Sequence, residues 1–154
     1  MATSRLVQLA DALATAIAAQ SFVPAGCVIG WAWSAEYTLA ELVQPHVTIL
    51  PSARAFARVS RAEVGRDATL AIDIQQRLPQ RPEGIAPATR LNPIDLLSES
   101  IAEWLLTQGT RITGGDFWAE ARTIDDVLPI VDGVVEQYRL AGSQMSVTFR
   151  LEVG

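Results

Sequence analysis

The last residues of the chain, QMSVTFRLEV (144–153), alternate without a break between polar and apolar side chains. Successive side chains of a β-strand point to opposite faces of the sheet, so this pattern predicts a strand with one buried face. The segment ATLAIDIQQRL (68–78) alternates in the same way. A chain with two such strands must pair them with others and cover one face of the resulting sheet.

Other segments supply the further strands. HVTIL (46–50) is rich in β-branched residues and is expected to end at Pro51. AFARVSRAEV (55–64) is expected to form a hairpin with 68–78, with a turn at Gly65, Arg66 and Asp67. An extended segment is predicted over 28–37, with a helical turn over 38–42.

Two segments have helical periodicity. Residues 4–20 repeat apolar side chains at helical spacing, with Thr3 or Ser4 as the N-cap. Residues 92–109 form the clearest helix, with Asn92 as N-cap, Pro93 at the first helical position and Gly109 as the stop. At about 100° per residue, one stripe of this helix should face the sheet. It consists of Ile94, Leu97, Ile101, Trp104 and Leu105.

The order of these elements predicts one α+β domain over residues 1–154. We expect a mostly antiparallel sheet of about four to six strands with the two main helices packed on one face. The proline-rich stretch 79–93 is interpreted as the linker from sheet to helix. In 111–142, turns are expected at 114–116 and 142, a strand over 118–124 and a short helix over 132–138.

Charge and composition limit the functional classes. The net charge is −5, the pI is near 4.8, and none of the basic residues is a lysine. Such a chain is poorly suited to gripping nucleic acid through phosphate contacts. There is no apolar run of the ~18 residues that a membrane span needs, and no signal-peptide pattern. We therefore expect a protein of the cytosol with no membrane anchor.

No motif indicates catalysis, a metal or a cofactor. The single cysteine, Cys27, excludes a disulfide within the chain, and neither Cys27 nor the single histidine, His46, lies in a recognisable nucleophile motif. Phosphate-binding glycine motifs are absent, and TGGD (113–116) is typical of a tight turn. The sequence predicts no catalytic, metal-binding or cofactor-binding residue. A small enzyme that uses Cys27 or His46 is kept as an alternative.

Three groups of residues are candidates for contacts between subunits. If 28–37 is extended, Trp31, Trp33 and Tyr37 share a face, where they serve as core or as an interface. An arginine cluster surrounds the expected hairpin, with Arg58 and Arg61 on opposite faces of a strand. Asp95, Glu99 and Glu103 form a helix stripe at spacings of four without a basic neighbour. The candidate arginines of the cluster are Arg54, Arg58 and Arg61, and Arg66 lies close to them in the sequence.

Taken together, these segments resemble the tail terminator (tail completion) proteins of long-tailed bacteriophages, tail-like particles and gene transfer agents. The resemblance is in the order of elements and covers nearly the whole chain. The phrases that carry it, after the N-terminal helix, are EYTLAEL (36–42), VTILP (47–51), RVSR (58–61), LAIDIQQRL (70–78), PIDLLSESIAEWL (93–105) and SVTFR (146–150).

The resemblance implies a structural virion subunit, not an enzyme. It implies a homo-oligomeric ring, expected to be a hexamer, at the head-proximal end of the tail tube. The implied partners are the tail tube protein and a head-closure or connector protein, with DNA only as cargo in the lumen. The subunit would be made in the host bacterial cytoplasm and reside in the tail or neck. Another neck component, such as a head-closure or adaptor subunit, is the alternative within this class.

Overall fold

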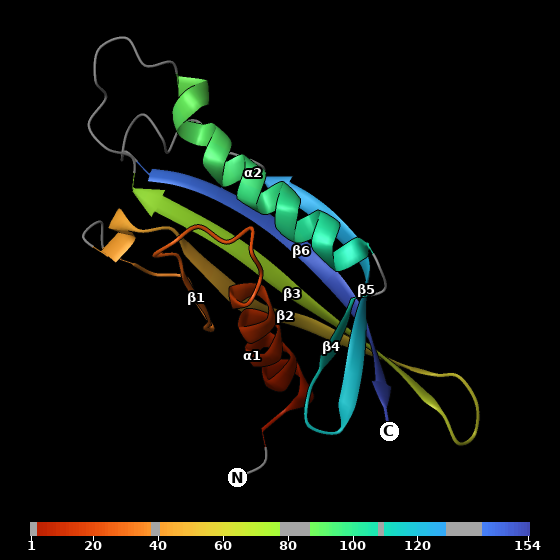
Figure 1. The fold of residues 1–154 in the computed structure, drawn as a ribbon. Coiled ribbons are helices and arrows are strands. Elements are labelled where there is room, and N and C mark those ends of the chain that lie inside the picture. Colours follow the sequence, from red (N-terminus) through yellow and green to blue (C-terminus); the bar gives the residue numbers. More distant parts are fainter. Residues whose placement is uncertain (1–2, 38–40, 78–86, 108–109, 129–139) are drawn as a thin grey trace.

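The computed structural model describes residues 3–37, 41–77, 87–107, 110–128 and 140–154. Its sheet has six strands in the order β1-β2-β3-β6-β5-β4, and only the β1–β2 pair is parallel. The α+β prediction is confirmed (Figure 1). The elements are α1 (Arg5–Ala18), β1 (Val28–Trp31), the 3-10 helix η1 (Glu41–Val43), β2 (His46–Arg58), β3 (Val64–Arg77), α2 (Pro87–Leu106), β4 (Arg111–Thr113), β5 (Phe117–Leu128) and β6 (Leu140–Val153).

Both helices cover the same face of the sheet, which we call the inner face (Figure 1). The alternating residues of β3 and β6 point into one core between the sheet and the helices. The expected inner stripe of α2 is confirmed, with Trp104 partly buried beside Phe22. The core positions of these three elements are Ala68, Leu70, Ile72, Ile74, Ile94, Leu97, Ile101, Leu105, Met145, Val147, Phe149 and Leu151.

The sheet curls around the N-terminal helix. Ser4 is the N-cap of α1, and its hydroxyl accepts a hydrogen bond from the Val7 amide. α1 contacts β1 and β2 near one edge of the sheet and also β4 at the other edge. Because one helix touches both edge strands, the inner face is concave and largely enclosed.

The predicted hairpin exists, but its turn and the end of β2 were placed wrongly. β2 continues through Pro51 to Arg58, and the chain turns at 59–63, so Gly65–Asp67 lie within β3. Pro51 stands at a break in the β2–β3 register, beyond the part of β2 that β1 pairs with. Proline is tolerated at such bulges and free edges because no ladder hydrogen bond is lost there.

Other boundaries also differ from the predictions. α2 begins at Pro87, so Asn92 is not its N-cap and Pro93 lies inside the helix. Proline is favoured at the first position of a helix, and both Pro87 and Pro93 could occupy it, so the local sequence does not decide which of them begins the helix. Gly142 pairs with Gln75 inside β6 and is not a turn. β5 extends the strand expected over 118–124, and Gly114–Asp116 form the predicted turn before it.

The linker predicted over 79–93 is wrong at 87–93, because these residues belong to α2. Other predictions lie outside the described residues: the rest of that linker over 79–86, the helix over 132–138, the start of the turn over 38–42 and the stop at Gly109. Within the described part of the chain, no helix is both long and apolar enough to cross a membrane.

Candidate subunit-interface surfaces

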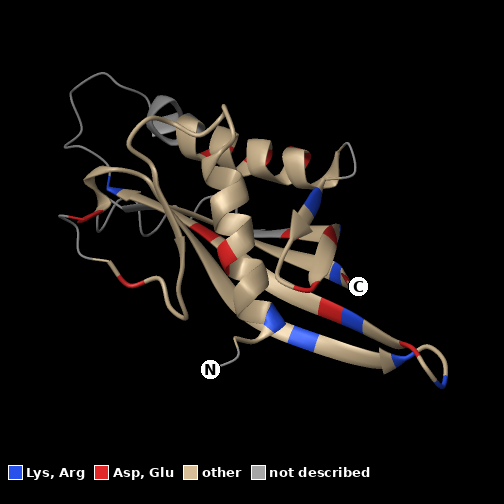
Figure 2. Ribbon diagram, turned by 60° about the horizontal axis from the view of Figure 1, so that its bottom comes forward, with Lys and Arg blue, Asp and Glu red and all other residues tan. Residues whose placement is uncertain are grey.

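The β2–β3 hairpin projects beyond the rest of the sheet, and we call residues 53–66 the arm (Figures 1 and 2). Its turn is closed by the Val59 and Ser60 amides, which donate to the Glu63 carbonyl. Cross-strand pairing joins Phe56 to Arg66 and Arg58 to Val64. Paired residues point to the same face, so Arg54, Phe56, Arg58, Val64 and Arg66 share one face of the arm.

Large apolar side chains on the arm are open to solvent. Phe56 is 64% exposed, and Val59 and Val64 are also exposed. Arg54, Arg58 and Arg61 are exposed as well, but Arg61 lies in the turn and not on a strand face. The arm therefore combines positive charge with apolar surface, which is typical of a contact region.

A pocket of about 230 Å³ lies between the root of the arm and the start of α1. Leu6, Phe56, Ala68 and Leu151 give it apolar walls. Three arginines, Arg5, Arg54 and Arg66, also line it. Arg5 binds both carboxylate oxygens of Asp116, at 2.7 and 3.1 Å, and this hydrogen-bonded pair lowers the pKa of Asp116.

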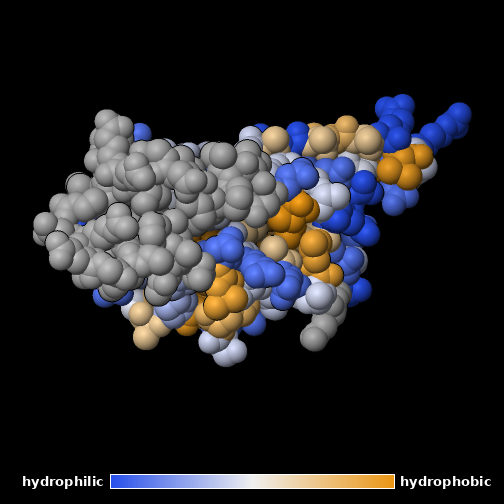
Figure 3. Space-filling view, turned by 90° about the horizontal axis from the view of Figure 1, so that it is seen from above, coloured by the Kyte–Doolittle hydropathy of each residue, from blue (hydrophilic) through white to orange (hydrophobic). Residues whose placement is uncertain are grey.

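The outer surface of α2 has the opposite charge. Asp95, Glu99 and Glu103 are exposed, as the sequence predicts for a stripe that avoids the core. Leu96 and Leu106 are exposed on the same helix. Seen from above, hydrophobic and hydrophilic positions alternate over the described surface, and the arm extends away from the body (Figure 3).

These two charged surfaces do not neutralise each other within the subunit. The ion pairs among the described residues join Arg5 to Asp116, Arg111 to Glu120 and Arg150 to Asp67. None of them involves the arginines of the arm or the carboxylates of α2. In Figure 2 the acidic positions of α2 and the basic positions of the arm lie in different parts of the molecule.

The three aromatic candidates do not form the expected stripe, because β1 ends at Trp31. Trp31 packs against the core, while Trp33 is 66% exposed and meets the Trp31 ring edge-on at 6.0 Å. The Tyr37 hydroxyl shares a hydrogen bond of 2.6 Å with the hydroxyl of Thr48. Thr48 points away from the inner face, because Val47 and Ile49 point into the core. Of these three aromatic residues, only Trp33 is exposed.

Cys27 and His46 face different environments. Cys27 packs against the core, and burial raises the pKa of its thiol. The centroids of the His46 and Tyr37 rings lie 4.6 Å apart with the rings tilted by 52°, and the His46 Nδ1 lies 3.0 Å from the Gln44 carbonyl oxygen. A raised thiol pKa disfavours the nucleophilic thiolate. The described geometry thus gives neither residue an activating partner.

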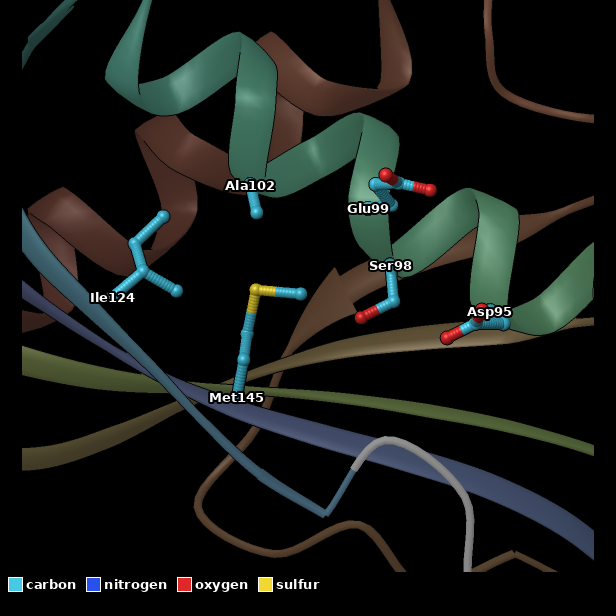
Figure 4. Close-up of a pocket in the computed structure, with 6 residues that line it drawn as sticks. All are labelled: Asp95, Ser98, Glu99, Ala102, Ile124 and Met145. Carbon is cyan, nitrogen blue, oxygen red and sulfur yellow. The ribbon is translucent and has the colours of Figure 1, made fainter.

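A second pocket, of about 340 Å³, lies between α2 and strands β5 and β6 (Figure 4). The Ser143 hydroxyl donates to the Ser98 hydroxyl there at 3.2 Å, and both side chains are buried. Its mouth carries Asp95 and Glu99, but the described residues contain no cluster of three metal-binding side chains. The lining residues are Asp95, Ser98, Glu99, Ala102, Ile124 and Met145.

Sequence reasoning missed the apolar members of these surfaces: Phe56, Val59 and Val64 on the arm, and Leu96 and Leu106 on α2. A sequence signal exists for Phe56, because it lies between Arg54 and Arg58 on the same face of the strand. A strand face that carries two arginines is expected to be exposed to solvent. Leu96 and Leu106 fall outside the inner stripe of the helix, which is the corresponding signal there. Comparison of the chain with protein-family models and with curated proteins gave no match.

Proposed function

We propose that this chain is a structural subunit of a phage-type tail, and that it forms a ring at the head-proximal end of the tail tube. The ring stops polymerisation of the tube and offers a surface to the head connector. The observation that carries the proposal is the pair of exposed surfaces of opposite charge, on the arm and on α2, which no ion pair joins within the described subunit.

Two different surfaces of complementary charge on one subunit suit a cyclic ring. A cyclic, head-to-tail contact uses two different patches on each subunit, and every copy then presents both of them. Complementary charge favours the correct partner and the correct register. Together with the resemblance in the order of elements, this supports a ring of six, with the tail tube protein and a head-closure or connector protein as its neighbours and DNA only passing through.

The test is deletion of the gene from the particle that encodes it, followed by electron microscopy. A terminator is expected to leave tails of uncontrolled length that do not join heads. Tails of normal length that fail to join heads would instead assign the chain to the head-closure or adaptor class. Normal tails joined to filled heads would contradict both assignments.

The exposed tryptophan gives a prediction about assembly. Trp33→Ala should weaken self-association by about tenfold or more, because buried tryptophans carry a large share of interface energy. It should not lower the melting temperature much, since Trp33 is 66% exposed in the subunit. Light scattering and thermal melting provide the two measurements. Trp31→Ala is the comparison: it should destabilise the fold itself, because Trp31 packs on the core.

A second prediction concerns Cys27 and His46. Cys27→Ser and His46→Ala should leave the yield of infectious or DNA-carrying particles essentially unchanged, since neither side chain has an activating partner in the described structure. Particle titres alongside melting curves provide the check. A collapse of titre with either variant at normal stability would revive the alternative of a small enzyme.

A further inference from the structure

We infer that the pocket at the root of the arm is the receptor for the outer surface of α2 from a second copy of this chain. The inference rests on the proposed function, because it names the contact that would close the ring. It goes beyond a general attraction between charged surfaces by assigning a pocket, a helix and a register.

The pocket has the chemistry of a receptor for an acidic, amphipathic surface. Leu6, Phe56 and Leu151 provide apolar walls, and Arg54 and Arg66 stand beside them. Arg5 is held by Asp116, and Asp67 is held by Arg150, at 2.7 and 2.6 Å. Arg54 makes no ion pair among the described residues, so it is available to a carboxylate from outside.

The outer surface of α2 has the matching composition. With about 100° per residue, Glu99 lies about 40° and Glu103 about 80° from Asp95 around the helix. Leu106 lies at about 20° and Leu96 at about 100° on the same scale. The three carboxylates and the two exposed leucines therefore occupy one sector of the helix, which is opposite in charge to the pocket and, like it, contains apolar side chains.

The spacings of the charges also match. Arg54 and Arg58 share a face of β2 and lie about 13 Å apart along an extended strand. Asp95 and Glu103 lie about 12 Å apart along a helix axis. An α2 helix laid along the arm can therefore place Asp95 and Glu103 near these two arginines and Glu99 close to Phe56 between them. Leu96 then lies about 4.5 Å further along the helix axis, towards Asp95.

The experiment uses disulfide trapping between two batches of the full chain, both carrying Cys27→Ser. One batch carries Phe56→Cys in the pocket and the other carries Leu96→Cys on α2. A disulfide between batches then requires two different molecules. We expect a yield several-fold above that of a control pair, in which Val43→Cys, another exposed apolar position, replaces Phe56→Cys.

Charge reversal tests the register. Adding Arg54→Glu to the Phe56→Cys batch should lower the disulfide yield about tenfold. Reversing the carboxylate opposite Arg54 in the Leu96→Cys batch should restore it, and this is Asp95→Arg for one direction of the helix along the arm and Glu103→Arg for the other. Melting curves of each variant exclude unfolding as the cause. A disulfide yield no higher than that of the Val43 control contradicts the inference. So does a loss of yield that the second charge reversal does not restore. The pocket would then bind a different protein.

The trapping experiment and the gene deletion test the contact and the proposed function separately. Specific trapping in a chain whose deletion leaves normal tails would mean that the contact exists in an assembly other than a tail terminator. Uncontrolled tail length without trapping would mean that the terminator ring closes through other residues.

Discussion

Ile101→Asp should leave the chain unfolded at room temperature. Ile101 is fully buried in the inner stripe of α2, where it faces the core beneath the helix. The substitution removes a large apolar side chain and places a charge without a partner in its site, at a cost of several kcal/mol. Domains of this size are stable by only about 5–15 kcal/mol in total. Leu97→Asp, one turn earlier in the same stripe, should act in the same way.

Glu99→Gln is the matched control, because it lies two residues from Ile101 on the solvent side of the same helix. It should leave the fold intact, since surface substitutions usually change stability by about 0.5 kcal/mol or less. Circular dichroism and thermal melting distinguish the two results. Equal stability of the Ile101→Asp and Glu99→Gln proteins would show that the inner face of α2 is misassigned.

Gly114→Ala should be the most damaging small substitution in the β4–β5 turn. A Cβ atom at this position would overlap the aromatic ring of Phe117. That ring is buried, and the Gly114 amide donates to the Phe117 carbonyl at 2.9 Å, so neither residue can move away easily. Forcing one methyl group into a filled site costs about 1–3 kcal/mol. A denaturation midpoint measured in urea should fall accordingly.

Gly30→Ala provides the comparison for this effect. No heavy atom lies within 4 Å of a Cβ added at Gly30, which is exposed on β1. Alanine also restricts the unfolded chain more than glycine does, so this variant should be neutral or slightly more stable. If both variants shifted the urea midpoint equally, contact with Phe117 would not be the reason that position 114 is glycine.

Sequence periodicity correctly predicted the features that depend only on residues close together in the chain. The alternation in 68–74 and 145–151 predicted which residues of β3 and β6 are buried, and the apolar spacing in α1 and α2 did the same. Ser4 was a correct N-cap candidate because its role depends only on residues within one helical turn. Each of these features is decided by neighbours in the sequence.

The wrong predictions concern strand boundaries that depend on pairing with a strand distant in the sequence. Gly65–Asp67 resemble a turn locally, yet β3 begins before them because all three pair with β2, and Arg66 and Asp67 also pair with β6. Pro51 resembles a stop, yet β2 passes through it at an irregularity in its pairing with β3, beyond the residues that pair with β1. The stripe of Trp31, Trp33 and Tyr37 fails because β1 ends where its pairing with β2 ends. Pairing partners are set by the fold and not by local spacing.

The sequence by itself determined the fold class, the inner faces of the main strands and helices, and which residues of α2 carry uncompensated charge. These follow from side-chain polarity repeated at the period of a helix or a strand. Only the tertiary structure decided that β1 lies parallel to β2, that the arm extends past the sheet, and that Leu6, Phe56 and Leu151 meet beside Arg54 in one pocket. Leu6 and Leu151 are 145 residues apart in the chain, and only the curl of the sheet around α1 brings them together, which no local pattern encodes.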